Sequence, residues 1–152
     1  MPQIDETDRR ILRILQKKGR ISNADLAVAA NVSSSACHRR VQRLEADGVI
    51  RDYVALLNPI HLDRRSTLFV EVTLTSQADD VLAEFERAVQ LVPDVLECHL
   101  MAGAADYMLK VVAADTDHFA KIHRTLVRLP GVVKMQSSFA MRTVFKTTSL
   151  PV

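Results

Sequence analysis

The segment from Ser22 to Ile50 constrains the fold of this 152-residue chain more than any other, because it predicts two short helices separated by a tight corner. In the first helix, Asn23 is the candidate N-cap. Apolar residues follow it at helical spacing, at Leu26, Ala27 and Ala30. Asn31 is suited to the left-handed conformation that ends a helix. The pattern therefore predicts a pair of helices joined at residues 31–33.

The second helix of the pair is predicted to begin after Ser33 and to stop at Gly48. Its apolar residues fall at i, i+4 and i+7, and at 100° per residue they form one stripe that faces the core, made of Cys37, Val41 and Leu44. The opposite face carries Ser35, His38, Arg39 and Gln42. Arg40 lies on the flank of the stripe, and Arg43 lies near the outer face.

A basic outer face indicates an acidic partner, and the DNA major groove admits one α-helix and presents base edges to it. Taken singly, each basic residue here is more often part of a solvated helix surface. A third helix precedes the pair and favours the DNA interpretation. It has an apolar face of Ile4, Ile11, Leu12 and Leu15, with Asp5 as N-cap and Asp8 at the capping-box position.

The charge of the chain is unevenly distributed. Residues 1–60 hold ten Lys and Arg against seven Asp and Glu, a net charge of +3, whereas residues 61–152 hold ten against eleven, a net charge of −1. The basic excess accompanies the helix pair. No apolar run has the ~20 residues of a membrane span, and the acidic N-terminal region does not resemble a signal peptide. With only two cysteines, of which Cys37 is predicted to be a core residue rather than a redox sensor, the sequence predicts a cytoplasmic protein with no membrane partner.

After residue 65 the apolar period changes from helical spacing to alternation. Leu68, Val70, Val72 and Leu74 alternate with polar residues, which predicts a strand with one buried face. A helix from Asp79, strands over 95–102 and 106–113, a helix from Asp115 or Thr116, and a last strand from Val132 to about Lys146 follow in order. The fold class is therefore α+β, with an N-terminal three-helix helix-turn-helix domain and a βαββαβ ferredoxin-like domain of the dimeric α/β-barrel type.

The predicted domains are residues 1–50 for the helix-turn-helix, 51–65 for an extended linker and 66–152 for oligomerisation and effector binding. In the last strand, Met135, Phe139 and Met141 share one parity. This pattern indicates a second apolar face of the sheet, which predicts that two sheets pack together in a homodimer.

Four segments carry a resemblance to the Lrp/AsnC family of bacterial and archaeal transcription regulators, and together they cover nearly the whole chain. They read IDETDRRILRILQKKGRISNADLA, SSSACHRRVQRLEADGVI, MAGAADYMLKV and SSFAMRTVFKTTSLP. The resemblance implies a sequence-specific regulator of amino-acid metabolism genes that binds double-stranded DNA. It also implies homodimers that assemble to octamers, and an amino-acid effector bound between C-terminal domains, with no cofactor.

The resemblance also implies positions for both sites. The DNA-binding residues would be Ser34, Ser35, His38, Arg39, Arg40, Gln42 and Arg43. Arg40 has two alternative roles, which are to bind a phosphate or to brace the fold. The effector-binding residues would be Gly103, Ala104, Ala105, Asp106, Ser137 and Ser138. In the effector loop, main-chain N–H groups beside Gly103 would hold an α-carboxylate, and Asp106 would accept from an α-ammonium. Ala104 and Ala105 depart from the polar or aromatic residues usual in the family. The alternative for this loop is a plain tight turn with Tyr107 in the core.

The sequence also bears on two other function classes. No phosphate loop, nucleophile elbow or paired-carboxylate pattern is present, so no catalytic residue is predicted and the chain is not expected to be an enzyme. His118 and His123 lack metal-ligand spacing with a Cys or carboxylate, so no metal site is predicted. An architectural DNA-binding protein without a small-molecule effector is the remaining alternative, and sequence preference in DNA binding distinguishes it.

Overall fold

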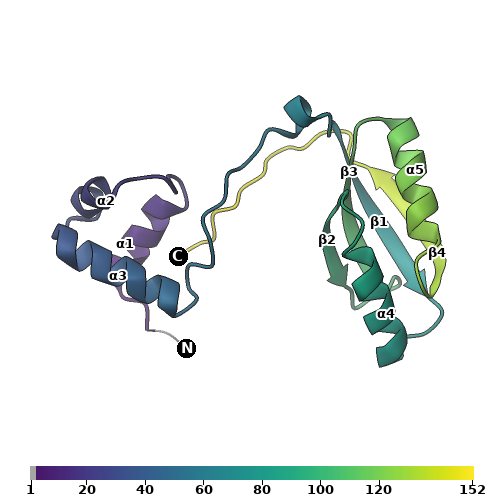
Figure 1. Ribbon diagram of the computed structural model, residues 1–152, viewed down its shortest axis with the longest axis horizontal. Coiled ribbons are helices and arrows are strands. Elements are labelled where there is room, and N and C mark those ends of the chain that lie inside the picture. Colours follow the sequence, from purple (N-terminus) through teal and green to yellow (C-terminus); the bar gives the residue numbers. More distant parts are fainter. Residues whose placement is uncertain (1–2) are drawn as a thin grey trace. The chain divides into compact units, whose positions relative to one another are not determined.

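The computed structural model describes residues 3–152, which form two compact units (Figure 1). The helical unit contains the chain up to Leu56 together with the tail Phe145–Val152, and the sheet unit contains Leu57–Val144. The predicted domain boundaries at residues 50 and 66 remain predictions, but the contacts assign the tail to the helical unit. Among residues 3–152, no helix is both long and apolar enough to cross a membrane.

Three helices form the helical unit: α1 (Glu6–Leu15), α2 (Asn23–Ala30) and α3 (Ser34–Ala46). Each contributes one apolar face to a shared core, as the helical spacing predicts. The fully or almost fully buried members are Ile11, Leu12, Leu26, Ala27, Ala30, Cys37 and Leu44. Burial also raises the pKa of the Cys37 thiol, which fits its predicted place in the core.

The helix termini confirm most of the predicted caps. Asp5 and Asp8 form a reciprocal capping box on α1, and Ser33 accepts from the Ala36 N–H at the start of α3. Asn31 ends α2 in the left-handed conformation, with φ 55° and ψ 55°. The prediction of Asn23 as N-cap is wrong, because Ser22 caps α2 by accepting from the Asp25 N–H. Serine and asparagine are comparable N-caps, so local preference alone did not separate these neighbours.

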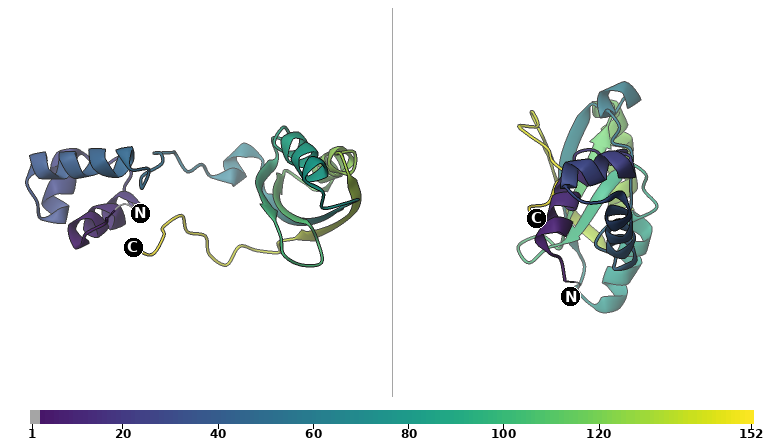
Figure 2. Two further views of the ribbon diagram at one scale, coloured as in Figure 1. Left: turned by 90° about the horizontal axis from the view of Figure 1, so that it is seen from below. Right: turned by 90° about the vertical axis from the view of Figure 1, so that its left-hand side faces the viewer.

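The sheet unit has the predicted βαββαβ order. After a 3-10 turn at Pro59–Leu62, its elements are β1 (Ser66–Leu74), α4 (Asp79–Val89), β2 (Val95–Leu100), β3 (Tyr107–Ala113), α5 (Thr116–Val127) and β4 (Val132–Phe139). All pairs are antiparallel in the order β2-β3-β1-β4, and both helices cover the same face of the curved sheet (Figure 2). This is the ferredoxin-like arrangement that the sequence predicts.

The core of the sheet unit lies between the sheet and its two helices. The alternating residues of β1, from Leu68 to Leu74, are all buried as predicted, and they pack against residues such as Phe85 of α4 and Ile122 of α5. Phe85 and Tyr107 are both almost completely buried, with ring centroids 4.7 Å apart. The Tyr107 hydroxyl donates to Glu86 Oε1 at 2.7 Å, so this buried polar atom has its partner.

The last strand differs from its prediction in length and in the face that its apolar residues occupy. β4 ends at Phe139 rather than near Lys146, and Met141 lies beyond it, fully exposed. Met135 and Phe139 pair with Val72 and Leu68, so they point to the helix-covered side. Met135 packs against the core, and Phe139 meets Phe119 of α5 edge-on. The interpretation of these residues as a second, open apolar face is therefore wrong.

Candidate DNA-binding and ligand-binding sites

The outer face of α3 carries five polar side chains that are all exposed, and we call it the reading face. Its residues are Ser34, Ser35, His38, Arg39 and Gln42. Cys37 and Leu44 anchor the opposite side of the helix in the core. Because an α-helix with one buried stripe presents its remaining surface outward, this face is free to enter a groove.

The start of α3 is held by serines and by one residue of α2. The Asn23 side-chain amide donates to the Ser34 main-chain oxygen at 3.0 Å and to Ser34 Oγ at 2.8 Å. The Ser33 hydroxyl lies 3.3 Å from that of Ser35. Asn23 therefore links the two helices of the pair, and the first turn of α3, whose residues reach base edges in helix-turn-helix proteins, is held in place from two sides.

Arg40 and Arg43 have a different environment from the reading face, because both bind acids of α1. Asp8 is completely buried and accepts from Arg40 Nη1 at 2.8 Å and from Arg43 Nη2. Arg40 Nη1 also lies 2.7 Å from Asp5 Oδ2. These contacts raise the pKa of Arg40. We name Asp5, Asp8, Arg40 and Arg43 the acid–arginine cluster.

The acid–arginine cluster joins α1 to α3 by charge-assisted hydrogen bonds. The Asp8 main-chain N–H, followed by the Arg40 guanidinium, lowers the pKa of Asp5 to about 2. A carboxylate buried like that of Asp8 is stable only when it is paired. Of the two roles left open for Arg40, this geometry supports bracing the fold, and it extends that role to Arg43.

The loop between β2 and β3 contains the candidate effector residues, and we call residues 101–106 the ligand loop. Its two ends are closed by main-chain hydrogen bonds, from the Met101 N–H to the Asp106 oxygen at 2.8 Å and from the Asp106 N–H to the Val72 oxygen at 2.9 Å. Between these ends, no main-chain N–H of residues 102–105 donates to an acceptor in the described part of the chain. Gly103 and Ala104 are exposed, and Ala105 is half-buried. The loop thus offers unpaired N–H donors, the kind of group that holds an anion.

The Asp106 carboxylate is hydrogen-bonded within the sheet unit, and the residue is only 7% exposed. Its Oδ2 accepts from the Leu74 N–H at 2.7 Å, and its Oδ1 accepts from Gln77 Nε2, also at 2.7 Å. Both carboxylate oxygens therefore tie the ligand loop to the end of β1 and to the segment before α4. This geometry favours a structural role for Asp106 over direct contact with an α-ammonium.

Ser137 and Ser138 are adjacent on β4, and successive strand residues point to opposite faces. Ser137 pairs with the buried Val70, so it points to the helix-covered side, whereas Ser138 pairs with Phe69 and points to the open face. The structure therefore does not bring the two hydroxyls together on one side of the sheet, and at most one of them lines any single pocket.

Three side chains with a part in these sites were not assigned one from the sequence: Asn23 as the link to Ser34, Asp8 as the partner of two arginines, and Gln77 as the partner of Asp106. Each acts through a partner between 11 and 35 positions away, and no local pattern encodes such a pairing. Among residues 3–152, no group of three or more His, Cys, Asp or Glu side chains is placed to hold a metal ion.

Each of the two units matches a known protein family. Residues 4–51 match the winged helix-turn-helix DNA-binding family, although residues 47–56 contain no strand, and residues 67–150 match the Lrp/AsnC ligand binding domain. The leucine-responsive regulatory protein of Escherichia coli is 43% identical over 97% of this chain and 90% of its own length.

Two solved structures are similar over almost their whole length. An AsnC family transcriptional regulator from Agrobacterium tumefaciens has a TM-score of 0.93 at 37% identity, covering 97% of this chain and 96% of its own. A transcriptional regulator from Neisseria meningitidis, solved in complex with L-methionine, has a TM-score of 0.93 at 36% identity, covering 98% and 97%. With matches of this extent to both units, the chain belongs to the Lrp/AsnC family of DNA-binding transcription regulators.

Proposed function

We propose that the reading face of α3 enters the DNA major groove and that Arg39 is its main base-reading side chain. The observation that carries this proposal is that the three arginines of α3 have different partners. Arg40 and Arg43 are bound to acids of α1, whereas no acidic partner of Arg39 lies within residues 3–152. An exposed arginine on a groove-facing helix can donate two hydrogen bonds to one guanine, which is the commonest specific contact to a base.

Replacing Arg39 with alanine is expected to weaken binding to a selected operator by about 1–3 kcal/mol, because one bidentate base contact is lost. The measurement is a fluorescence anisotropy titration at fixed salt concentration. Arg87→Ala on the exposed side of α4 is the matched control, since it removes the same side chain from the sheet unit. Equal operator affinities for the Arg39 and Arg87 variants would show that Arg39 does not read a base.

The architectural alternative is tested by the same titration. If the protein binds its selected operator and random DNA of equal length with similar affinity, the contacts are to phosphates alone and the reading role is wrong. We expect the wild-type ratio to exceed about 10³, the lower range for specific binding, and Arg39→Ala to reduce it.

We further propose that the ligand loop binds the α-carboxylate of an amino acid through its main-chain N–H groups. The unpaired donors at residues 102–105 support this, and so does the L-methionine complex of the Neisseria relative. Main-chain donors survive the change to alanine at positions 104 and 105. In this proposal Asp106 shapes the loop rather than contacting the ligand, and the side chain of the amino acid lies elsewhere.

Gly103→Val is expected to abolish the stabilisation of the protein by its amino acid while leaving the fold intact. A Cβ added at Gly103 meets no atom within 4 Å, so the fold accepts a side chain that would obstruct the loop. Thermal unfolding is measured with each of the twenty amino acids. A binding amino acid at a hundred times its Kd would stabilise the wild type by about 2.7 kcal/mol. Ala120→Val at an exposed position of α5 is the control; a ligand response that survives in Gly103→Val would place the site outside the ligand loop.

We also propose that the protein forms homodimers that assemble to octamers, acts in the cytoplasm and has no catalytic activity. Exposed apolar side chains of the sheet unit support self-association, whereas the parity of β4 does not. Leu96 and Leu100 of the edge strand β2 are each more than half exposed, and Phe69 on the open face is 42% exposed. Size exclusion with light scattering tests the assembly, and a monomer at micromolar concentration would contradict it.

A further inference from the structure

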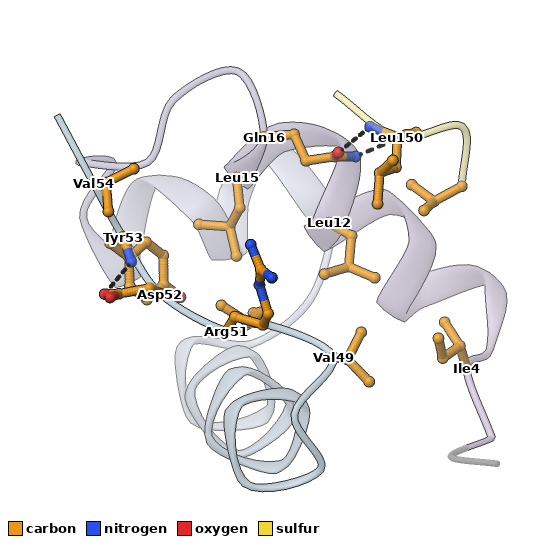
Figure 3. A pocket seen from close by; sticks show the side chains of 12 residues that line it. Ile4, Leu12, Leu15, Gln16, Val49, Arg51, Asp52, Tyr53, Val54 and Leu150 are labelled. Carbon is orange, nitrogen blue, oxygen red and sulfur yellow. Dashed lines mark hydrogen bonds between the residues drawn. The ribbon is translucent and has the colours of Figure 1, made fainter. Parts of the chain in front are cut away.

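The tail Phe145–Val152 contacts α1 through directional hydrogen bonds (Figure 3). The side-chain amide of Gln16, the residue that follows α1, bonds both main-chain groups of Leu150, since its Nε2 donates to the Leu150 oxygen at 3.1 Å and its Oε1 accepts from the Leu150 N–H. One turn earlier, Arg13 Nε donates to the Val152 oxygen at 2.8 Å. A side-chain amide that bonds both the N–H and the C=O of one residue satisfies these main-chain groups much as a neighbouring strand does.

The tail also borders an apolar groove of the helical unit, with a volume of about 360 Å³. Ile4, Leu12 and Leu15 line it together with the segment Val49–Val54, and Leu150 and Val152 line it from the tail. Val152 is partly buried and packs against the core of the three helices. The groove therefore takes part of its wall from residues about 100 positions beyond Val54.

We propose that this groove is the docking site for the end of the chain's own tail, residues 149–152. We further propose that this docking is required for the reading face to hold its position. The main-chain contacts to Gln16 and Arg13 set the position of the tail along α1. Val152 packs against the core of the three helices and supplies the hydrophobic contact, whereas Leu150 lines the groove but stays 72% exposed. A segment without charged side chains and with an apolar residue at every second position matches a groove lined mainly by apolar side chains.

The link from the tail to the reading face runs through α1. Arg13 and Gln16, at the C-terminal end of α1, hold the tail, while Asp5 and Asp8, at its N-terminal end, hold Arg40 and Arg43 of α3. A displacement of α1 therefore acts directly on the acid–arginine cluster. The tail follows β4 after five connecting residues, so the covalent chain joins the sheet unit to this contact. The effect on DNA binding rests on the proposed reading role of α3, whereas the docking itself does not.

The docking is tested with the full chain carrying Leu150→Asp, which places a charge beside the apolar side chains that line the groove. Thr148→Asp is the control, because Thr148 lies in the same tail but does not line the groove. Hydrogen exchange of the α1 amides is the first readout, because it needs no DNA. We expect faster exchange in Leu150→Asp and unchanged exchange in Thr148→Asp. Adding the octapeptide FKTTSLPV in excess should restore protection to the Leu150 variant. Equal exchange in the two variants would overturn the docking.

Operator affinity is the second readout. We expect Leu150→Asp to bind the selected operator about tenfold more weakly, equivalent to about 1.4 kcal/mol, and Thr148→Asp to bind like the wild type. Loss of α1 protection with unchanged operator affinity would overturn the coupling to the reading face. Failure of the reading role itself has a separate signature, since Arg39→Ala would then bind like the wild type.

A cross-link identifies the occupant of the groove. Gln16→Cys and Leu150→Cys are combined in a Cys98→Ser background and treated with a short bismaleimide, because Cys98 is exposed and Cys37 is buried. A cross-linked species at the mass of one chain on a denaturing gel supports docking of the chain's own tail. A covalent dimer would show that the tail of a second copy fills the groove and would overturn this assignment.

Discussion

Asp8→Ala is expected to destabilise the helical unit by about 3 kcal/mol, as measured by hydrogen exchange of the α1–α3 amides. The substitution removes the only buried carboxylate among the described residues of this unit, with its bonds to Arg40 and Arg43 and its half of the capping box. Breaking a buried ion pair costs about 3–5 kcal/mol. The lower end of that range applies because the side chains of Arg40 and Arg43 are 27% and 46% exposed and regain hydration.

Glu6→Ala is the matched control for Asp8→Ala, since it removes another acid from the first turn of α1. The Glu6 carboxylate pairs with Arg13 at 3.0 Å, but both side chains are largely exposed, so the loss should stay below about 1 kcal/mol. Asp8→Asn should fall between the two, because it retains an acceptor but not the charge. If Glu6→Ala and Asp8→Ala destabilise equally, the acid–arginine cluster is not what joins α1 to α3.

Asp106→Ala is expected to destabilise the sheet unit by about 2–3 kcal/mol. The buried Leu74 N–H loses its acceptor and Gln77 loses its partner, and an unsatisfied buried donor costs about 1–3 kcal/mol. Asp106→Asn should be much milder, because the new amide oxygen still accepts from Leu74 and the Gln77 amide can turn to present its oxygen. Calorimetry of the two variants measures the difference.

The Asn variant also separates the two roles considered for Asp106. If Asp106 only shapes the ligand loop, Asp106→Asn keeps its amino-acid response in a thermal-shift measurement, since the main-chain donors are unmoved. If the carboxylate contacts the α-ammonium, the variant folds normally and loses that response, which would contradict the structural role proposed above.

The sequence predicted those parts of the fold that depend on local pattern. Alternation along β1 and helical spacing in α3 identified the buried faces, and the caps at Asp5 and Ser33 depend on residues three positions apart. The face of β4 was predicted wrongly because parity tells which residues lie together but not to which side they point. That choice comes from the pairing of Ser137 with Val70, and a shift of one residue reverses it.

The candidate sites, too, could be predicted only where they depend on local pattern. The exposed positions of α3 follow from its period, so the reading face could be predicted. The different roles of Arg39, Arg40 and Arg43 could not, because they depend on Asp8, 32 to 35 positions earlier in the chain. Likewise, Asp106 looks like a free ligand group until the Leu74 N–H and Gln77 are placed against it.

The packing of Val152 against the core of the helical unit has a consequence for protein synthesis. The three helices leave the ribosome first, but one of the residues that pack against their core, Val152, is made about 100 positions after α3 ends. The sheet unit lies between them in the sequence, and domains generally fold as units during synthesis. A nascent chain therefore carries an incomplete DNA-binding unit until its sheet has been translated. A chain cut short by a premature stop codon after β4 would retain its candidate ligand loop but lack the tail that completes the groove.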